Sequence, residues 1–237
     1  MRRLIAIATC HKFRARADLL RHTWVPDVGD RADVRFFFGK SSLGVDGKLW
    51  DEEVELDVPD DYEHFRYKIQ AIFRWSIEQG YDFTFKTDDD VYVIPERLFE
   101  QFVGNDYVGR VRGPSQENVA PRIYGVSESS FCSGFGYWLS NRAARIVANA
   151  PDNGDWAEDR FAGQALFRAG INPYFNRGYL LWPPLSGHFC SRPNKECGAC
   201  WAQYRTASVI CPYARPDAIA ILHRYYKDSG FIPTWLS

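Results

Sequence analysis

Three consecutive carboxylates, Asp88, Asp89 and Asp90, follow the mostly apolar stretch Phe83–Phe85 and precede a second one, Val91–Val93. Acidic side chains this close together repel one another, and they lose solvation when apolar neighbours surround them. A bound divalent cation would offset both costs. Oxygen ligands of this kind suit Mg²⁺ or Mn²⁺, which also bind diphosphate oxygens. The alternative is an acidic turn on a solvated face, and the apolar flanks favour the metal.

A second pair of acids, Glu158 and Asp159, begins the segment Ala157–Arg168, whose pattern predicts a helix. The helix dipole favours the ionised form of a carboxylate in the first turn, so Asp159 could accept a proton. Both residues could equally be the acids that commonly begin helices.

Two glycines, Gly134 and Gly136, indicate a place where the backbone approaches another group closely or adopts a positive φ. Such a segment could be a loop beside a bound sugar, or a tight turn into the predicted strand Tyr137–Leu139.

Three basic residues could contact a nucleotide. Arg16 and Arg21 could pair with phosphate or stack on a base, or they could cover a solvated helix face. Lys86, just before the acidic run, could be a surface residue at a strand end or a charge partner to the acids.

A cysteine-rich segment at 188–211 contains Cys197 and Cys200 in a C-x-x-C arrangement, flanked by Cys190 and Cys211. Four thiols in such a window could hold a structural Zn²⁺. In a secretory compartment they could instead form two disulfides.

The elements that position these residues alternate between strands and helices, which favours an α/β fold around a mostly parallel sheet. In such sheets ligands bind outside the carboxyl ends of the strands, where the acidic run is expected. The predicted strands are Leu4–Thr9, Val34–Phe38, Val54–Val58, Tyr81–Lys86 and Ala218–Leu222, and the main predicted helices are Ala15–Thr23, Tyr62–Gln79, Asn141–Ala150 and Ala157–Arg168.

Composition narrows the classes of function. The 237 residues are 46% hydrophobic, which is enough for one sizeable core, and a single domain over 1–237 is expected. With 29 basic and 30 acidic residues the net charge is -1, so nucleic acid is not an expected partner. The apolar stretch Leu4–Ala8 is too short to span a membrane. The chain is therefore expected in the cytoplasm, or as the trimmed lumenal part of an anchored protein.

The motifs occur in an order that resembles the β-1,3-galactosyltransferase and fringe group of glycosyltransferases, which share the GT-A fold. The acidic run resembles the D-x-D motif of that group. The resemblance extends over Arg16 to Trp24 (R…LR-x-TW), Val34–Gly39, Tyr62–Trp75 with Lys68, Phe131–Tyr137 with Ser140, Trp156–Gly163 and Ile221–His223. Arg160 stands where the group's E-D-V motif has Val, and Phe65-Arg66 where it has Asn-Leu.

The resemblance implies a metal-dependent enzyme that transfers a hexose or N-acetylhexosamine from a UDP-sugar to a glycan hydroxyl, forming a β-1,3 linkage. It implies that Asp90 ligates Mn²⁺ or Mg²⁺ directly. Asp88 would contact the ribose or the metal's waters, with Asp89 in support. Arg16, Arg21, Lys86, Gly134 and Gly136 would then belong to the donor site.

The resemblance also assigns the proton acceptor and a third metal ligand. Asp159 would be the base, on the side of the anomeric carbon opposite the diphosphate, so the reaction would invert that carbon. His223 would complete the metal's protein ligands after the late strand, and it fits better than His188 in the cysteine-rich segment.

In this interpretation 1–110 is a Rossmann-like nucleotide-sugar half that ends after the D-x-D motif, and 111–237 is the acceptor and catalytic half. Two other functions remain open. A phosphatase of the haloacid dehalogenase type would use the first Asp of such a run as a nucleophile. A non-catalytic sugar-binding module could keep the fold.

Overall fold

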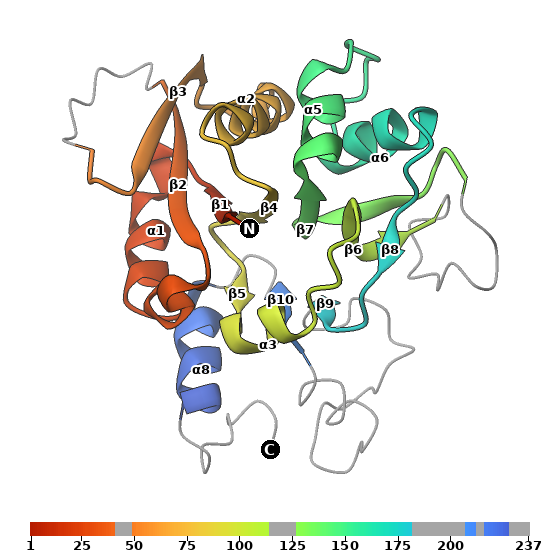
Figure 1. Ribbon diagram of the computed structural model, residues 1–237. Helices are drawn as coiled ribbons and strands as arrows, with labels where there is room; N and C mark the ends of the chain where they lie inside the picture. Colours follow the sequence, from red (N-terminus) through yellow and green to blue (C-terminus); the bar gives the residue numbers. More distant parts are fainter. Residues whose placement is uncertain (41–48, 114–126, 182–206, 212–215, 228–237) are drawn as a thin grey trace, which may run out of the picture. The chain divides into compact units, whose positions relative to one another are not determined.

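The computed structural model describes residues 1–40, 49–113, 127–181, 207–211 and 216–227 (Figure 1). Residue contacts divide the chain into two compact units. The first unit comprises 1–14, 30–89 and 103–176, and the second comprises 15–29, 90–102 and 177–237. No helix in the described ranges is long and apolar enough to cross a membrane.

The first unit is built on a seven-stranded sheet with the order β3-β2-β1-β4-β7-β6-β8. The neighbours β3, β2, β1 and β4 are mutually parallel, as are β6 and β8, and β7 runs antiparallel to both β4 and β6. The strands are β1 (Arg3–Ala8), β2 (Asp33–Lys40), β3 (Glu53–Pro59), β4 (Phe83–Asp88), β6 (Tyr107–Arg112), β7 (Phe131–Ser140) and β8 (Tyr174–Phe175). This mostly parallel α/β sheet confirms the expected fold class.

Three helices pack on one face of this sheet (Figure 1): α2 (Phe65–Glu78), α5 (Asn141–Asn149) and α6 (Glu158–Arg168). Their apolar residues recur at helical spacing, so each helix turns one stripe inward. Ser140 caps α5 by accepting from the amide of Ala143 at 3.2 Å. Leu4, Ala6 and Phe37 from the strands join these stripes in a single core.

The order in which successive strands are added to the sheet reverses between β1 and β4. From β1 the chain adds β2 and β3 on one side, and then β4 on the other. A crevice at the carboxyl ends of the strands is expected where the order reverses, and this is where such sheets bind ligands. Thr9 follows β1 at this edge, and Asp88 ends β4.

In its described residues, the second unit contains a three-stranded sheet with the order β5-β10-β9 and three α-helices. Trp24, which follows the first of these helices, donates from Nε1 to the carbonyl of Val91 at 3.1 Å. The α-helices are α1 (Arg14–Arg21), α3 (Pro95–Glu100) and α8 (Pro216–Lys227), and the strands are β5 (Tyr92–Val93), β9 (Tyr179–Leu181) and β10 (Val209–Cys211). Two 3-10 segments are η1 (His11–Phe13) and η2 (Val25–Arg31).

The predicted late strand Ala218–Leu222 is wrong, because these residues lie inside helix α8. A run of five apolar residues fits a strand or a buried helix equally well by periodicity. Pro216 at the first helical position, and Arg224 and Lys227 in the last turn, favour the helix.

Candidate functional site

Lys86 connects the acidic run to the first turn of α6. Its side chain is 0% exposed, and its Nζ lies 2.8 Å from Asp88 Oδ1 and 2.8 Å from Glu158 Oε1. The same nitrogen donates to the carbonyl of Gly134 at 2.6 Å. The surface interpretation of Lys86 is therefore wrong, and its role as a charge partner to the acids is confirmed.

Glu158 is buried and held on both carboxylate oxygens. Oε1 accepts from Lys86, and Oε2 accepts from the hydroxyl of Tyr137 at 2.8 Å. Burial raises the pKa of Glu158 to about 7, although Lys86 acts in the opposite direction. For Lys86, burial alone would lower the pKa, but Asp88 and Glu158 outweigh it and the pKa is raised.

Asp159, the predicted proton acceptor, lies in the first turn of α6 as expected. Its Oδ2 accepts from the amide of Gly134 at 3.0 Å, and its Oδ1 accepts from the amide of Arg160 at 2.8 Å. Burial raises the pKa of Asp159, and these amides oppose the rise without cancelling it. The net shift is therefore opposite to the one expected from the helix dipole.

Gly134 and Gly136 lie within strand β7, so neither the loop nor the tight turn expected from the sequence is present there. The expectation of a close approach holds for Gly134. A Cβ at this position would lie 2.4 Å from Glu158 Oε1 and 3.6 Å from the Cβ of Asp159. A larger residue would therefore displace the carboxylate of Glu158 from its place beside Lys86.

The middle acid, Asp89, turns inward. It is buried, and its Oδ2 accepts from the hydroxyl of Thr9 at 2.7 Å. This bond joins the chain after β4 to the chain after β1, at the reversal of the sheet order. The side chains of Asp88 and Asp90 are each 28% exposed. Asp89 therefore supports the segment, and its two neighbours retain access to solvent.

Asp90 belongs to the second unit, where its Oδ2 lies 4.0 Å from Nη1 of Arg16. Arg21, on the same helix α1, pairs with Asp18 at 2.6 Å, and its side chain is only 8% exposed. The interpretation of Arg21 as part of a solvated face is wrong. Arg16 carries positive charge close to the last acid of the run.

His223 lies in helix α8 of the second unit, and the strand that was expected to position it is absent there. Its Nδ1 lies 3.2 Å from the hydroxyl of Tyr92, two residues after Asp90. Burial lowers the pKa of His223, which favours the neutral imidazole that metals bind. The residue is thus close in the fold to the chain that follows the acidic run.

Asp60 is a buried centre that the sequence interpretation missed. Its carboxylate accepts from the amides of His11 and Gly39, both at 2.7 Å, and pairs with the buried Lys68. Lys68 also donates to the carbonyl of Thr9 at 2.8 Å. Asp60 and Lys68 therefore join the chain that follows β1 to the end of β2 at the proposed ligand edge.

The cysteine-rich segment largely lies outside the described residues. This applies to Cys190, Cys197, Cys200 and His188, and for Cys211 only the backbone in β10 is described. The choice between zinc and disulfides stays a prediction.

Asp88 and Asp90 carry carboxylate oxygens, the kind of ligand that a divalent cation prefers. They do not by themselves form a complete set of ligands. In the described ranges no three His, Cys, Asp or Glu side chains are arranged to hold a metal. Mg²⁺ in phosphate-transferring sites is commonly held by only one or two carboxylates, with waters and substrate phosphates as its other ligands. Asp88 Oδ1 is buried against Lys86, while 28% of the Asp88 side chain stays exposed to solvent.

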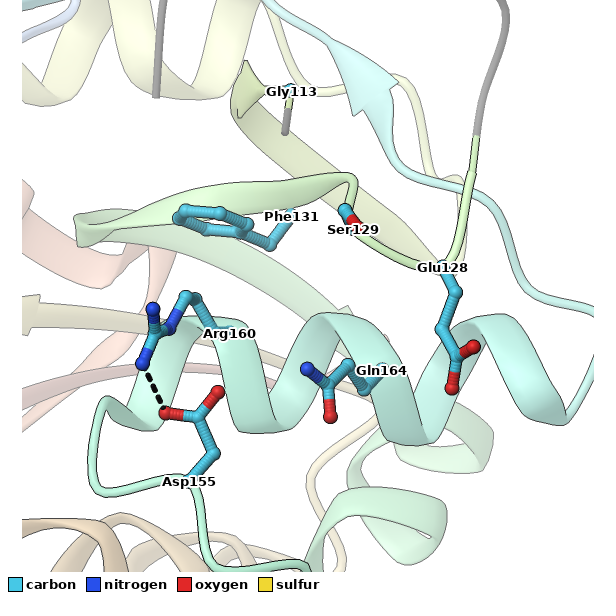
Figure 2. Close-up of a pocket in the computed structure, with 7 residues that line it drawn as sticks. All are labelled: Gly113, Glu128, Ser129, Phe131, Asp155, Arg160 and Gln164. Atoms are coloured by element: carbon cyan, nitrogen blue, oxygen red, sulfur yellow. Dashed lines mark hydrogen bonds and ion pairs between the residues drawn. The ribbon is translucent and has the colours of Figure 1, made fainter. Parts of the chain in front are cut away.

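A cavity of about 230 Å³ opens along α6, between Asp155 before the helix and Gln164 within it (Figure 2). Asp155 and Arg160 pair at 2.7 Å on one wall, and Phe131 at the start of β7 faces them. The remaining lining residues are Gly113, Glu128, Ser129 and Gln164. Charged and amide groups beside an aromatic ring suit a polar, hydroxyl-rich ligand.

Comparison with known proteins gives a consistent result. A model of the galactosyltransferase family matches residues 15–120. Beta-1,3-galactosyltransferase 1 of Mus musculus is 25% identical over 208 residues, covering 76% of this chain and 64% of that protein. The Homo sapiens protein of the same name gives the same values. The probable beta-1,3-galactosyltransferase 13 of Arabidopsis thaliana is 29% identical over 111 residues, 40% of this chain and 32% of that protein.

The matched part of the chain thus spans 64% of the length of the mouse and human relatives. The family model includes the acidic run, and the longer alignments extend well beyond it. Together with the mostly parallel α/β sheet, these matches confirm the resemblance that the motifs indicate, and residues 15–120 match the galactosyltransferase family.

Proposed function

We propose that the protein is an inverting, metal-dependent glycosyltransferase that moves a hexose or N-acetylhexosamine from a UDP-sugar to a glycan hydroxyl, with a β-1,3 linkage as product. One observation carries the proposal. Lys86 pairs with Asp88 at the end of β4 and with Glu158 at the start of α6, and it donates to the carbonyl of Gly134, whose amide donates to Asp159.

Transfer from a nucleoside diphosphate requires that the charge developing on the diphosphate be stabilised. A divalent cation, when bound, supplies Lewis-acid stabilisation of that leaving group. Asp88 and Asp90 would hold it, with Mn²⁺ or Mg²⁺ as the expected ions. His223 is the candidate for a third protein ligand, because Tyr92 contacts Nδ1 and the other ring nitrogen, Nε2, is the one that would bind the ion. Arg16, close to Asp90, adds a positive charge for the donor's phosphates.

The acceptor hydroxyl must lose a proton as it attacks, and Asp159 is the group proposed to take it. The amide of Gly134 fixes one oxygen of Asp159, and burial makes the carboxylate a stronger base than an exposed one. We assign this role to Asp159 rather than to Glu158, because Glu158 is buried and forms an ion pair with Lys86, whereas Asp159 is only partly buried and accepts from backbone amides. Glu158 acts as a positioning residue that keeps Lys86 between the two acidic segments.

The experiment that tests the proposal measures UDP release from UDP-galactose, UDP-N-acetylglucosamine and UDP-N-acetylgalactosamine in Mn²⁺, with and without acceptor glycans. A parallel assay with a phosphomonoester tests the phosphatase alternative. Acceptor-dependent UDP release, lost in Asp159→Asn, supports the proposal. Hydrolysis of the phosphomonoester without UDP release from any donor would overturn it.

A further inference from the structure

Two of the most exposed aromatic side chains in the described part of the chain lie next to each other. Tyr62 is 73% exposed and Trp156 is 64% exposed, and their ring centroids are 6.0 Å apart. A third ring, Phe65, stacks on Tyr62 at 6.3 Å with an interplanar angle of 12°. Single exposed apolar residues are common on protein surfaces, but a contiguous exposed group is informative.

The loop that carries Trp156 is anchored to helix α2. Arg66 donates to both carboxylate oxygens of Asp152, at 2.8 and 2.6 Å, and the hydroxyl of Tyr67 donates to Asp152 at 2.8 Å. Asp155 also accepts from the amide of Ala157 at 3.0 Å. The indole of Trp156 is therefore exposed on a loop that these hydrogen bonds hold against α2.

The aromatic group borders the proposed reaction centre. Lys86 Nζ lies 5.2 Å from the centroid of the Phe65 ring, and the same nitrogen contacts Asp88 and Glu158. Trp156 precedes the proposed base, Asp159, by three residues. All of these contacts lie within the first unit.

We infer that Tyr62 and Trp156 form a stacking platform for a sugar ring of the acceptor glycan. The inference rests on the proposed function, since it places the acceptor on the side of Asp159. The C–H face of a pyranose packs on an aromatic face, and the sugar's hydroxyls need polar partners at its edge. The cavity lined by Asp155, which directly precedes Trp156, together with Arg160 and Gln164, offers such partners (Figure 2). A platform beside the base would hold the acceptor ring while one of its hydroxyls reaches Asp159.

The binding test uses methyl β-galactoside and methyl N-acetyl-β-glucosaminide as probes in saturation-transfer NMR with the full chain. Wild type and Trp156→Phe should transfer saturation to the ring protons of at least one probe, and Trp156→Ala and Tyr62→Ala should lose it. Trp50→Ala is the matched control, because Trp50 is a 53% exposed tryptophan that precedes β3. No transfer to either probe in wild type, or undiminished transfer in Trp156→Ala, would overturn the inference.

A kinetic test separates this inference from the proposed function. Trp156→Ala should raise the acceptor KM about tenfold or more, while the KM for the UDP-sugar and the affinity for UDP in Mn²⁺ stay unchanged. An unchanged acceptor KM in an active enzyme would remove the platform and leave the glycosyltransferase proposal intact. Probe binding that depends on Trp156, in a protein that turns over no UDP-sugar, would support the platform and remove the enzymatic proposal.

Discussion

Lys86 and Glu158 form an ion pair at 2.8 Å although both side chains are almost completely buried. A buried pair of this kind is not a strong source of stability by itself, because desolvation offsets much of the attraction. Removing one partner is costly, since the other charge is then left without compensation. The pair joins strand β4 to helix α6, the two elements that carry the proposed acidic groups.

Lys86→Met should lower the free energy of unfolding by ~3–5 kcal/mol at pH 8, the range for breaking one side of a buried pair. The loss should be smaller at pH 5.5. The pKa of Glu158 in the folded chain, about 7, lies above its ordinary value of 4.5, so the folded state binds the proton more tightly. The contribution of Glu158 to stability therefore falls as pH rises from 4.5 to 7, and at pH 5.5, below the folded-state pKa, a neutral Glu158 tolerates the missing cation.

Denaturant unfolding at the two pH values measures this effect. Lys86→Met combined with Glu158→Gln should recover much of the stability at pH 8, because the unpaired carboxylate is gone. Lys40→Met is the control, since Lys40 pairs with Asp57 on the exposed surface and should change little. An equal loss at both pH values would contradict the assignment of the penalty to Glu158.

Chelation should abolish sugar transfer, and Mn²⁺ should restore it, if Asp88 and Asp90 hold the cation. Asp90→Ala should weaken UDP binding measured by calorimetry in Mn²⁺, because the diphosphate is bound through the ion. Asp57→Ala, at an exposed position on β3, should leave UDP binding unchanged. Equal affinity for UDP in Mn²⁺ and in EDTA would show that the assignment of the acidic run to a metal is wrong.

Asp159→Asn should reduce transfer by ~10²–10⁴-fold, the usual range for loss of a general base. Asparagine is nearly isosteric and keeps an oxygen that can accept from the amide of Gly134, so UDP affinity should stay near that of wild type. The measurement compares turnover with calorimetric UDP binding in the same preparation. A variant that keeps more than half of the wild-type turnover would exclude Asp159 from the mechanism.

The pH profile tests the same residue independently. A base must be ionised to accept a proton, so activity should fall as pH drops through the pKa of Asp159. Burial raises that pKa, so the acid limb should lie above the ordinary value of 3.8. Glu158→Gln should keep this limb, because Glu158 is proposed to position rather than to accept the proton. If the limb disappears in Glu158→Gln, the group that titrates is Glu158 and not Asp159.

Much of the fold could be predicted from local patterns. Strands β1 to β4 and helices α2, α5 and α6 show long apolar periodicities with clear ends, and they form close to the expected residues. Helix α8 was missed because its apolar run, Ala218–Leu222, has no period that separates strand from helix. Strand β7 was placed too short, because Gly134 and Gly136 resemble a turn until the packing of Glu158 against Gly134 is known.

The site was harder to predict because its key contacts are far apart in the chain. The position of Asp159 at a helix start follows from the sequence, but the bridge from Lys86 to Glu158 spans 72 residues. One signal was present in the sequence. A lysine between apolar strand residues is almost never buried without a partner, so Lys86 required an acid from another element. Asp60 and Tyr137 carried no comparable signal.

His223 provides a test of the metal proposal that does not depend on the acids. The imidazole lies in α8 beside Tyr92, and with Nδ1–H donating to the Tyr92 oxygen its Nε2 has a lone pair for a cation. The lowered pKa keeps the ring neutral at physiological pH. His223→Ala should therefore raise the Mn²⁺ concentration needed for half-maximal transfer, and Tyr92→Phe should raise it less, because it removes only the group that orients the ring.

His22→Ala is the matched control, since His22 is an exposed histidine of the same unit that bonds the carbonyl of Asp18. It should leave the Mn²⁺ requirement unchanged, as should His188→Ala. If His188→Ala raises the requirement and His223→Ala does not, the protein ligand lies in the cysteine-rich segment. His223 would then serve only to pack α8 against β5, and loss of the ring should lower stability without changing the dependence of transfer on Mn²⁺.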